Sequence, residues 1–116
     1  MKKLLLPIIT LAVAATTAWA ASIWKITVTT VPADTATRCD TAIVTNGMSR
    51  SHIIVVNNGT SNAAYVGFSN AVSASANGIL LVANGGALTI DRTDIDEQIW
   101  VYSTSGTDIA VLEGWE

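Results

Sequence analysis

Few side chains in this sequence are of the types that carry out catalysis. His52 is the only histidine, and nucleophilic catalysis needs a base beside the nucleophile. Ser69 lies in a Gly-Phe-Ser-Asn-Ala stretch that lacks the second glycine of the G-x-S-x-G nucleophile turn. We therefore predict that the chain is not an enzyme and has no catalytic residues. We interpret His52 as a hydrogen-bonded structural imidazole at the start of an apolar strand.

Carboxylates are densest in one short segment, where Asp91, Asp94, Asp96 and Glu97 follow one another closely. Hard cations such as Ca²⁺ need several oxygen ligands on a flexible loop, but this spacing does not match an EF-hand, which has glycine at its sixth position. We interpret the segment as a solvated acidic turn and predict no metal ligands. The glycines of residues 84–86 lack the lysine of a phosphate-binding loop, so we predict a hairpin turn there and no cofactor.

Aromatic side chains are the remaining candidates for a binding role, as a stacking platform for sugars or as core and interface residues. They are Trp24, Tyr65, Phe68, Trp100, Tyr102 and Trp115. In the strand around residue 100, Ile99 and Val101 point one way while Trp100 and Tyr102 point the other. A small sandwich buries one face of each sheet, so the second apolar face needs a partner. We predict that Trp100 and Tyr102 anchor this interface, because large rigid aromatics dominate interface energies.

Short strands with turn residues between them are needed to position these side chains. In residues 23–31, Trp24, Ile26 and Val28 alternate with Lys25 and two threonines, as in a strand with one buried face. The run from Ile53 to Val56 is apolar without a break, which predicts a strand covered on both sides and places Ile54 in the core.

Turn residues predict three hairpins in the second half of the chain. They join residues 52–57 to 63–68 through Asn58-Gly59, 79–83 to 87–91 through Asn84-Gly85-Gly86, and 98–104 to 108–114 through Ser105-Gly106. A further strand at residues 42–44 precedes a turn at Asn46-Gly47, and residues 69–78 are a loop of small residues. Seven or eight strands at this spacing are typical of an antiparallel sandwich or barrel.

Composition and charge restrict the function further. The chain has 116 residues, is 50% hydrophobic and only 13% charged, and carries a formal charge of −3. A single packed domain is expected, and disorder from low hydrophobicity is excluded. Because binding to phosphates requires clustered Lys and Arg, we predict no nucleic-acid partner. Cys39 is the only cysteine, so the domain has no internal disulfide; we expect a small buried side chain and, mildly, assembly in a reducing cytoplasm.

The N-terminal segment has the three parts of a secretory signal. Lys2 and Lys3 precede an apolar stretch, and Ala18-Trp19-Ala20 forms a cleavage site, which predicts cleavage after Ala20. The uncharged stretch of residues 4–24 is also long enough to cross a bilayer as a helix. An uncleaved anchor and an apolar arm buried in an assembly are the alternatives.

Three stretches of the sequence resemble small β-rich virion structural proteins of tailed bacteriophages. They are SHIIVVNNGTSNAAYVGFS, NGILLVANGGALTID and IWVYSTSGTDIAVLEGW. Those proteins share an apolar strand ending in Asn-Asn-Gly, a YVG strand, a glycine turn before LTID, a VYS hairpin and a terminal VLE, in the order found here between Ser51 and Trp115. The resemblance implies a non-enzymatic protein that decorates or reinforces a capsid or belongs to a tail. It brings no functional residues with it.

The sequence thus predicts an all-β chain, with an apolar segment at residues 1–20 and a single domain at residues 21–116. The domain is a small antiparallel β-sandwich, jelly-roll-like or barrel-like, of seven or eight short strands. We expect a structural or interaction module of a virion that binds itself, capsid proteins or tail proteins. It would meet a membrane only transiently, through residues 1–20. The alternative is a secreted or periplasmic binding domain, with glycans as one ligand class, released by cleavage at Ala20.

Overall fold

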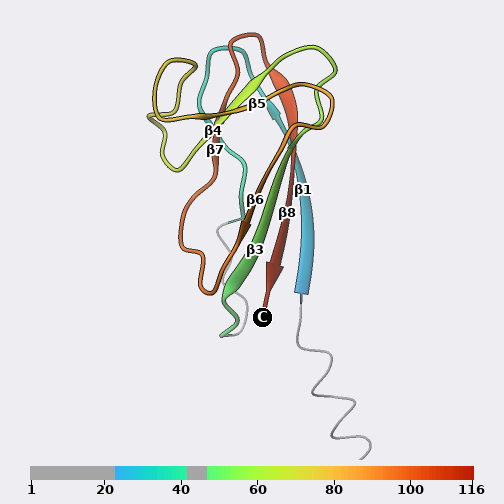
Figure 1. Ribbon diagram of the computed structural model, residues 1–116, viewed down its shortest axis with the longest axis vertical. Coiled ribbons are helices and arrows are strands. Elements are labelled where there is room, and N and C mark those ends of the chain that lie inside the picture. The colour runs from blue at the N-terminus through green and yellow to red at the C-terminus, as the bar shows by residue number, and fades with distance from the viewer. Residues whose placement is uncertain (1–22, 42–46) are drawn as a thin grey trace, which may run out of the picture.

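The computed structural model describes residues 23–41 and 47–116, and all regular elements in these two ranges are β-strands (Figure 1). The eight strands are β1 (Ile23–Val31), β2 (Thr37–Arg38), β3 (Arg50–Asn57), β4 (Ala64–Gly67), β5 (Ile79–Leu81), β6 (Ala87–Asp91), β7 (Trp100–Tyr102) and β8 (Thr107–Trp115). The predicted all-β class is therefore confirmed. The predicted N-terminal segment at residues 1–20 and the predicted strand at residues 42–44 lie outside the described residues.

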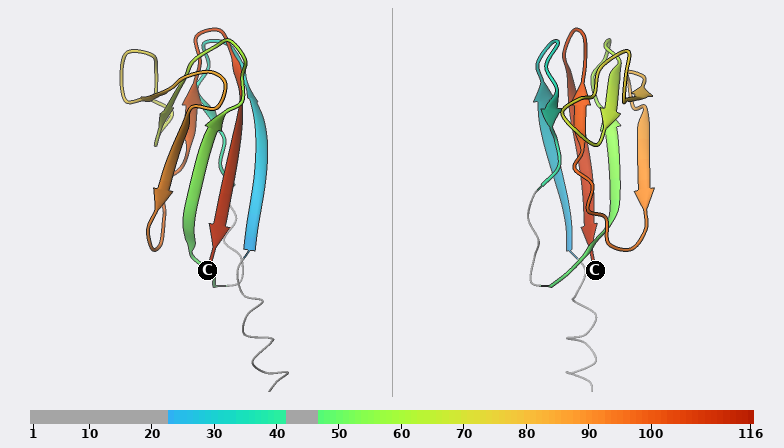
Figure 2. Two further views of the ribbon diagram at one scale, coloured as in Figure 1. Left: turned by 45° about the vertical axis from the view of Figure 1, so that its right-hand side comes forward. Right: turned by 90° about the vertical axis from the view of Figure 1, so that its left-hand side faces the viewer.

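The strands form two antiparallel four-stranded sheets, which we call sheet A and sheet B. Sheet A has the order β1-β8-β3-β6, and sheet B has the order β2-β7-β4-β5. Each strand of the first half of the chain pairs with its counterpart in the second half, β1 with β8, β2 with β7, β3 with β6 and β4 with β5. The chain is thus one long hairpin wound into two layers (Figure 2). This is the topology of a jelly roll.

All three predicted hairpins are wrong, because each of the three turns connects strands of different sheets. β3 and β4, β5 and β6, and β7 and β8 are divided between sheets A and B. Turn residues such as Gly106, with a φ of 86°, do reverse the chain. They do not determine whether the chain returns in the same sheet or crosses to the facing one, about 10 Å away. β4 and β5 are the only consecutive described strands that pair with each other, through the loop of small residues 68–78.

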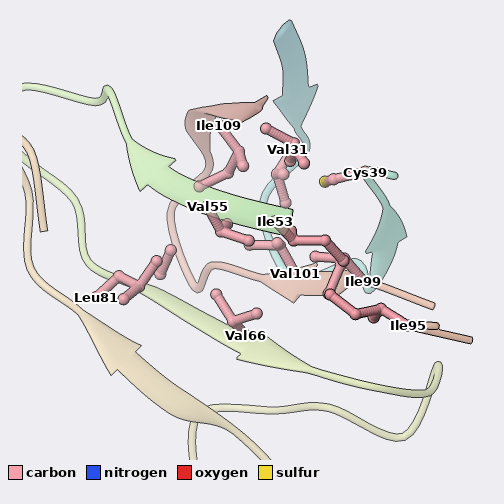
Figure 3. Packing of buried hydrophobic residues seen from close by; sticks show 12 residues of the cluster. Val31, Cys39, Ile53, Val55, Val66, Leu81, Ile95, Ile99, Val101 and Ile109 are labelled. Atoms are coloured by element: carbon pink, nitrogen blue, oxygen red, sulfur yellow. The ribbon is translucent and has the colours of Figure 1, made fainter. Parts of the chain in front are cut away.

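The core lies between the two sheets. Alternate residues of β3 and β8 face inward and are fully buried, including Ile53, Val55 and Ile109, and they pack against Val66 and Val101 of sheet B (Figure 3). The period of two in β3 gives the burial pattern expected for a strand with one core face. Ile54 is therefore not a core residue: it is half-buried and points away from sheet B.

Candidate interaction surface

Strand β1 carries the most exposed apolar side chains of the described chain. Its alternation directs Trp24, Ile26 and Val28 away from sheet B, and these side chains are 54%, 68% and 64% exposed. The pattern predicted from the sequence for residues 23–31 is thus present. The apolar set, however, lies on the outer face of the sheet. The inner face of β1 is formed by the alternate residues Thr27, Thr29 and Val31, of which Val31 belongs to the core.

The apolar surface continues from β1 across the next two strands. The register places Ile26 beside Leu112 of β8, which in turn lies beside Ile54 of β3. The next row joins Val28, Ala110 and Val56 in the same way. We call these seven residues the outer patch: Trp24, Ile26, Val28, Ile54, Val56, Ala110 and Leu112. Contiguous apolar surface of this kind is uncommon on monomeric proteins and is typical of interaction sites.

Trp24 is held in place at one end of the outer patch. Its ring stacks on His52 of β3, with the ring centroids 5.2 Å apart and an angle of 22° between the planes. Gly114 of β8 lies beneath it, and a Cβ added there would come within 2.7 Å of the indole. His52 Nδ1 lies 2.9 Å from Asp91, and Nε2 lies 3.4 Å from Glu116. The indole is therefore exposed but ordered, which lowers the entropy cost of using it in a contact.

Trp100 and Tyr102, the interface residues predicted from the sequence, lie on the outer face of sheet B. Both are half-buried, and Ile99 and Val101 point into the core as predicted. Trp100 Nε1 donates to Gln98 Oε1 at 2.9 Å. The phenol of Tyr102 donates to Asp34, which raises the pKa of the tyrosine. Their polar groups are thus satisfied within the chain, and their role as interface anchors stays a prediction.

Other exposed apolar residues gather around β5 at the edge of sheet B. They are Phe68, Ile79, Leu80 and Val82. Tyr65 of β4 pairs with Leu80 on one side and with Tyr102 on the other. Sheet B therefore also presents apolar surface, but its edge strand has three residues where β1 has nine.

A cluster of buried charges closes the end of the sandwich where β1 begins and β8 ends. Arg50 Nη1 lies 2.8 Å from Glu113 Oε2 and 3.0 Å from Asp40 Oδ2. Arg38 also binds Asp40, with Nε 2.9 Å from Oδ1. Main-chain amides of Thr41 and Ile99 donate to the two carboxylates. The cluster joins β3 and β8 of sheet A to the segment after β2.

Hydrogen bonds determine the charge states in this cluster. Burial by itself raises the pKa of Asp40, but hydrogen bonds from Arg38, Arg50 and the Ile99 amide outweigh it and hold the pKa below its usual value. Arg50 loses solvation on burial, yet its bonds to Glu113 and Asp40 raise its pKa overall. Each charge faces an opposite charge, so the cluster links segments that are distant in the sequence.

The sequence interpretation missed this cluster, although part of its signal was present. In β8, Glu113 continues the inward-facing series of Ile109 and Val111, and it is followed by Trp115. A carboxylate at an inward position of an apolar strand requires a buried partner. Which arginine supplies that partner depends on the pairing of strands distant in the sequence.

The other residues considered for chemistry do not come together in one site. His52 lies in sheet A, whereas Ser69 follows β4 of sheet B. In the acidic segment, Glu97 pairs with Arg92, which lowers the pKa of the glutamate. Within residues 23–41 and 47–116 there is no group of three or more Asp, Glu, His or Cys side chains placed to hold a metal ion.

Two hollows lie at opposite ends of the sandwich. The first, of about 280 Å³, is beside the charged cluster and is lined by Asp40, Arg50, Asp96 and Trp115 among others. The second, of about 480 Å³, lies among the polar turns at the far end of β1 and β3. Asn57 supports that end, with Thr107 Oγ1 donating to its Oδ1 at 2.7 Å. Of the six aromatic residues considered as a sugar platform, only Trp115 lines either of these hollows.

Cys39 is buried in the core cluster, as expected from the sequence. Loss of solvent raises the pKa of its thiol to about 12, so the thiolate is scarce near neutral pH. In the part of the chain that the structure describes, no helix has the length and apolar character needed to span a membrane.

Comparisons of the sequence with protein-family models and with curated proteins find no match.

Proposed function

We propose that this chain is a non-enzymatic structural module of a virion, a capsid decoration or tail-associated protein, that docks through the outer patch of sheet A. The observation that carries the proposal is the row of exposed apolar side chains on β1, at 54–68% exposure, continued by half-buried residues of β8 and β3. Solvent exposure of ordered apolar groups is unfavourable unless a partner covers them.

The fold is compatible with this role. Jelly rolls are common in viral capsid proteins, and also in lectin domains and other protein classes. Fold alone does not determine function. The second support is the resemblance of residues 51–115 to phage virion proteins. That resemblance covers β3 to β8, which supply three of the four strands of sheet A and three of the four strands of sheet B.

Charge around the outer patch indicates what kind of partner it fits. Asp108 lies at one end of the patch, bonded to Thr30, and Asp91 and Glu116 lie at the other end beside His52. Apolar surface with acidic ends favours a protein partner that carries apolar groups flanked by Lys or Arg. The same charge disfavours nucleic acid and anionic lipid.

The test is the composition of purified particles. Particles from the cells that carry this gene are banded in a density gradient and analysed by mass spectrometry. The proposal predicts that the chain bands with the major capsid protein at a fixed ratio. It further predicts that an Ile26→Lys, Val28→Lys variant is lost from the particles, whereas Leu80→Lys, Val82→Lys on sheet B, with similar exposure, is retained. Absence of the unmodified chain from the particles would overturn the proposal.

The second candidate is a secreted or periplasmic glycan-binding domain. It is supported by the row of Tyr65 and Tyr102 on sheet B, next to Trp100, since aromatic faces stack on sugars. This candidate predicts a mature chain that begins at Ala21 and is found outside the cytoplasm. Intact-mass analysis distinguishes the two, because full-length protein recovered from particles contradicts secretion, and binding to a glycan array supports it.

A further inference from the structure

We propose that two copies of this chain pair antiparallel through the free edges of their β1 strands, about a two-fold axis at Thr27. The proposal rests on the proposed function and deepens it, because it names a second copy as the partner of the β1 edge that borders the outer patch. It rests on three features of the molecule: the length of the free edge, the register that the edge permits, and the charges beside it.

The β1 edge differs from the other three sheet edges. β2, β5 and β6 have two, three and five residues, and short edge strands are one way in which proteins prevent pairing with other chains. β1 has nine residues in unbroken register with β8, without a bulge. Among the described residues β1 pairs with β8 alone, and no described segment lies beyond it (Figures 1 and 2). A row of main-chain donors and acceptors is therefore available to another strand.

The side chains of β1 are self-complementary about its centre. Thr27 is the middle residue of the strand, so an antiparallel pair centred there uses all nine residues of both copies. In this register Ile26 lies directly opposite Val28 of the partner subunit, on the outer face of the joined sheet. Cross-strand pairs of branched aliphatic residues stabilise antiparallel sheets. The two outer patches become one continuous apolar surface over an eight-stranded sheet.

Charges on and beside β1 do not oppose this arrangement. Lys25, the only charged residue of the strand, faces Thr29 of the partner subunit. The two lysines are four residues apart along the strand, about 13 Å, which exceeds the screening length of about 8 Å at physiological salt. Asp108 lies behind Thr30, which faces Trp24 of the partner subunit. No two like charges are directly opposite, and the resulting interface is isologous, as in most homodimers.

The test is analytical ultracentrifugation of the purified full chain with two charge variants. Ile26→Lys, Val28→Lys and Ile26→Glu, Val28→Glu each place like charges opposite one another in the proposed register. We expect the unmodified chain to sediment at twice the mass of one chain, and each variant to associate at least about tenfold more weakly. Mixing the two variants in equal amounts should restore the dimer, because every Lys then faces a Glu.

The matched control is Leu80→Lys, Val82→Lys. It adds the same two positive charges at similarly exposed positions of sheet B and should leave the dimer intact. Circular dichroism verifies that each variant is folded. The inference is overturned if the unmodified chain is monomeric, if the β1 variants dimerise as it does, or if mixing them restores nothing. A monomer that still bands with particles overturns the dimer and leaves the proposed function standing. A dimer that is absent from particles overturns the proposed function and leaves the dimer standing.

Discussion

Two groups of apolar residues, Trp100 with Tyr102 on sheet B and the β1 part of the outer patch on sheet A, differ in exposure and in bonding. On sheet B, Trp100 and Tyr102 are half-buried, and their polar groups bond to Gln98 and Asp34 of the same chain. On sheet A, the three outer-patch residues of β1 are each more than half exposed, and apart from the indole nitrogen of Trp24 their side chains carry no polar group. The difference teaches that aromatic side chains and exposed apolar surface need not coincide. An indole or phenol whose polar group is bonded within its own chain has less need of a partner than an exposed aliphatic side chain.

Substitutions on the two faces of β3 test the boundary between core and outer patch. Ile53→Asp puts an unpaired charge into the fully buried core, so we expect it to cost several kcal/mol, on the order of the whole stability of a small domain. Ile54→Asp lies on the half-buried outer face and should cost about 1 kcal/mol. Urea denaturation followed by tryptophan fluorescence measures both. Equal losses at the two positions would show that the outer patch is as much core as the inner face.

Arg50 tests how far the charged cluster holds the two sheets together. Arg50→Met leaves Asp40 and Glu113 buried without their shared cation, and breaking a buried pair in this way costs about 3–5 kcal/mol. Arg92→Met removes the exposed pair with Glu97 and should leave the free energy of unfolding almost unchanged. Both variants are compared by denaturation midpoints. If both variants lower the denaturation midpoint only slightly, water solvates the carboxylates of Asp40 and Glu113 once Arg50 is removed.

The cluster also predicts how stability depends on pH. The folded pKa of Asp40 is lowered from its ordinary value of 3.8, so its contribution is complete above the unfolded pKa and is lost as the pH falls through the folded one. We expect Asp40→Asn to be less stable than the unmodified chain at pH 7, and the difference to shrink below pH 3.8. Urea midpoints at pH 7, 5 and 3 check this. A difference that stays constant with pH would assign the effect to packing.

Tyr102→Phe should have the smallest effect. It removes the hydroxyl that donates to Asp34, so we expect almost no change in the free energy of unfolding and none in self-association. Denaturation and sedimentation of the same sample measure both quantities. Loss of the dimer in this variant would show that the interface lies on sheet B and not on sheet A.

Local properties of the fold followed from the sequence, whereas its pairing did not. The alternation in residues 23–31 and the inward direction of Ile99 and Val101 depend on a period of two, which short segments display by themselves. The pairing of β3 with β8 brings Ile54 beside Leu112, and no local pattern specifies such a distant contact. Turns at Gly59 and Gly106 indicated where the chain reverses, but the sheet to which it returns depends on which strands bury the most apolar surface together.

An excess of apolar surface was predictable from the sequence, but the position of its most exposed part, on β1, was not. An excess of apolar faces over the needs of a small sandwich follows from the strand patterns, and it led to the prediction of an interface at Trp100 and Tyr102. The edge position of β1 became visible only with the sheet order. The Arg50 cluster depends on three segments that are far apart in the sequence, so the charge of Glu113 alone did not reveal its partners.

Hydroxyl-radical footprinting of Trp24 and Trp100 tests the central claim most directly. The full chain is labelled at low concentration and at a concentration where it associates, and oxidation of each tryptophan is measured by mass spectrometry. The account predicts that Trp24, 54% exposed in the single chain, is protected on association and that Trp100 is not. Protection of Trp100 with unchanged oxidation of Trp24 would contradict it and place the assembly surface on sheet B.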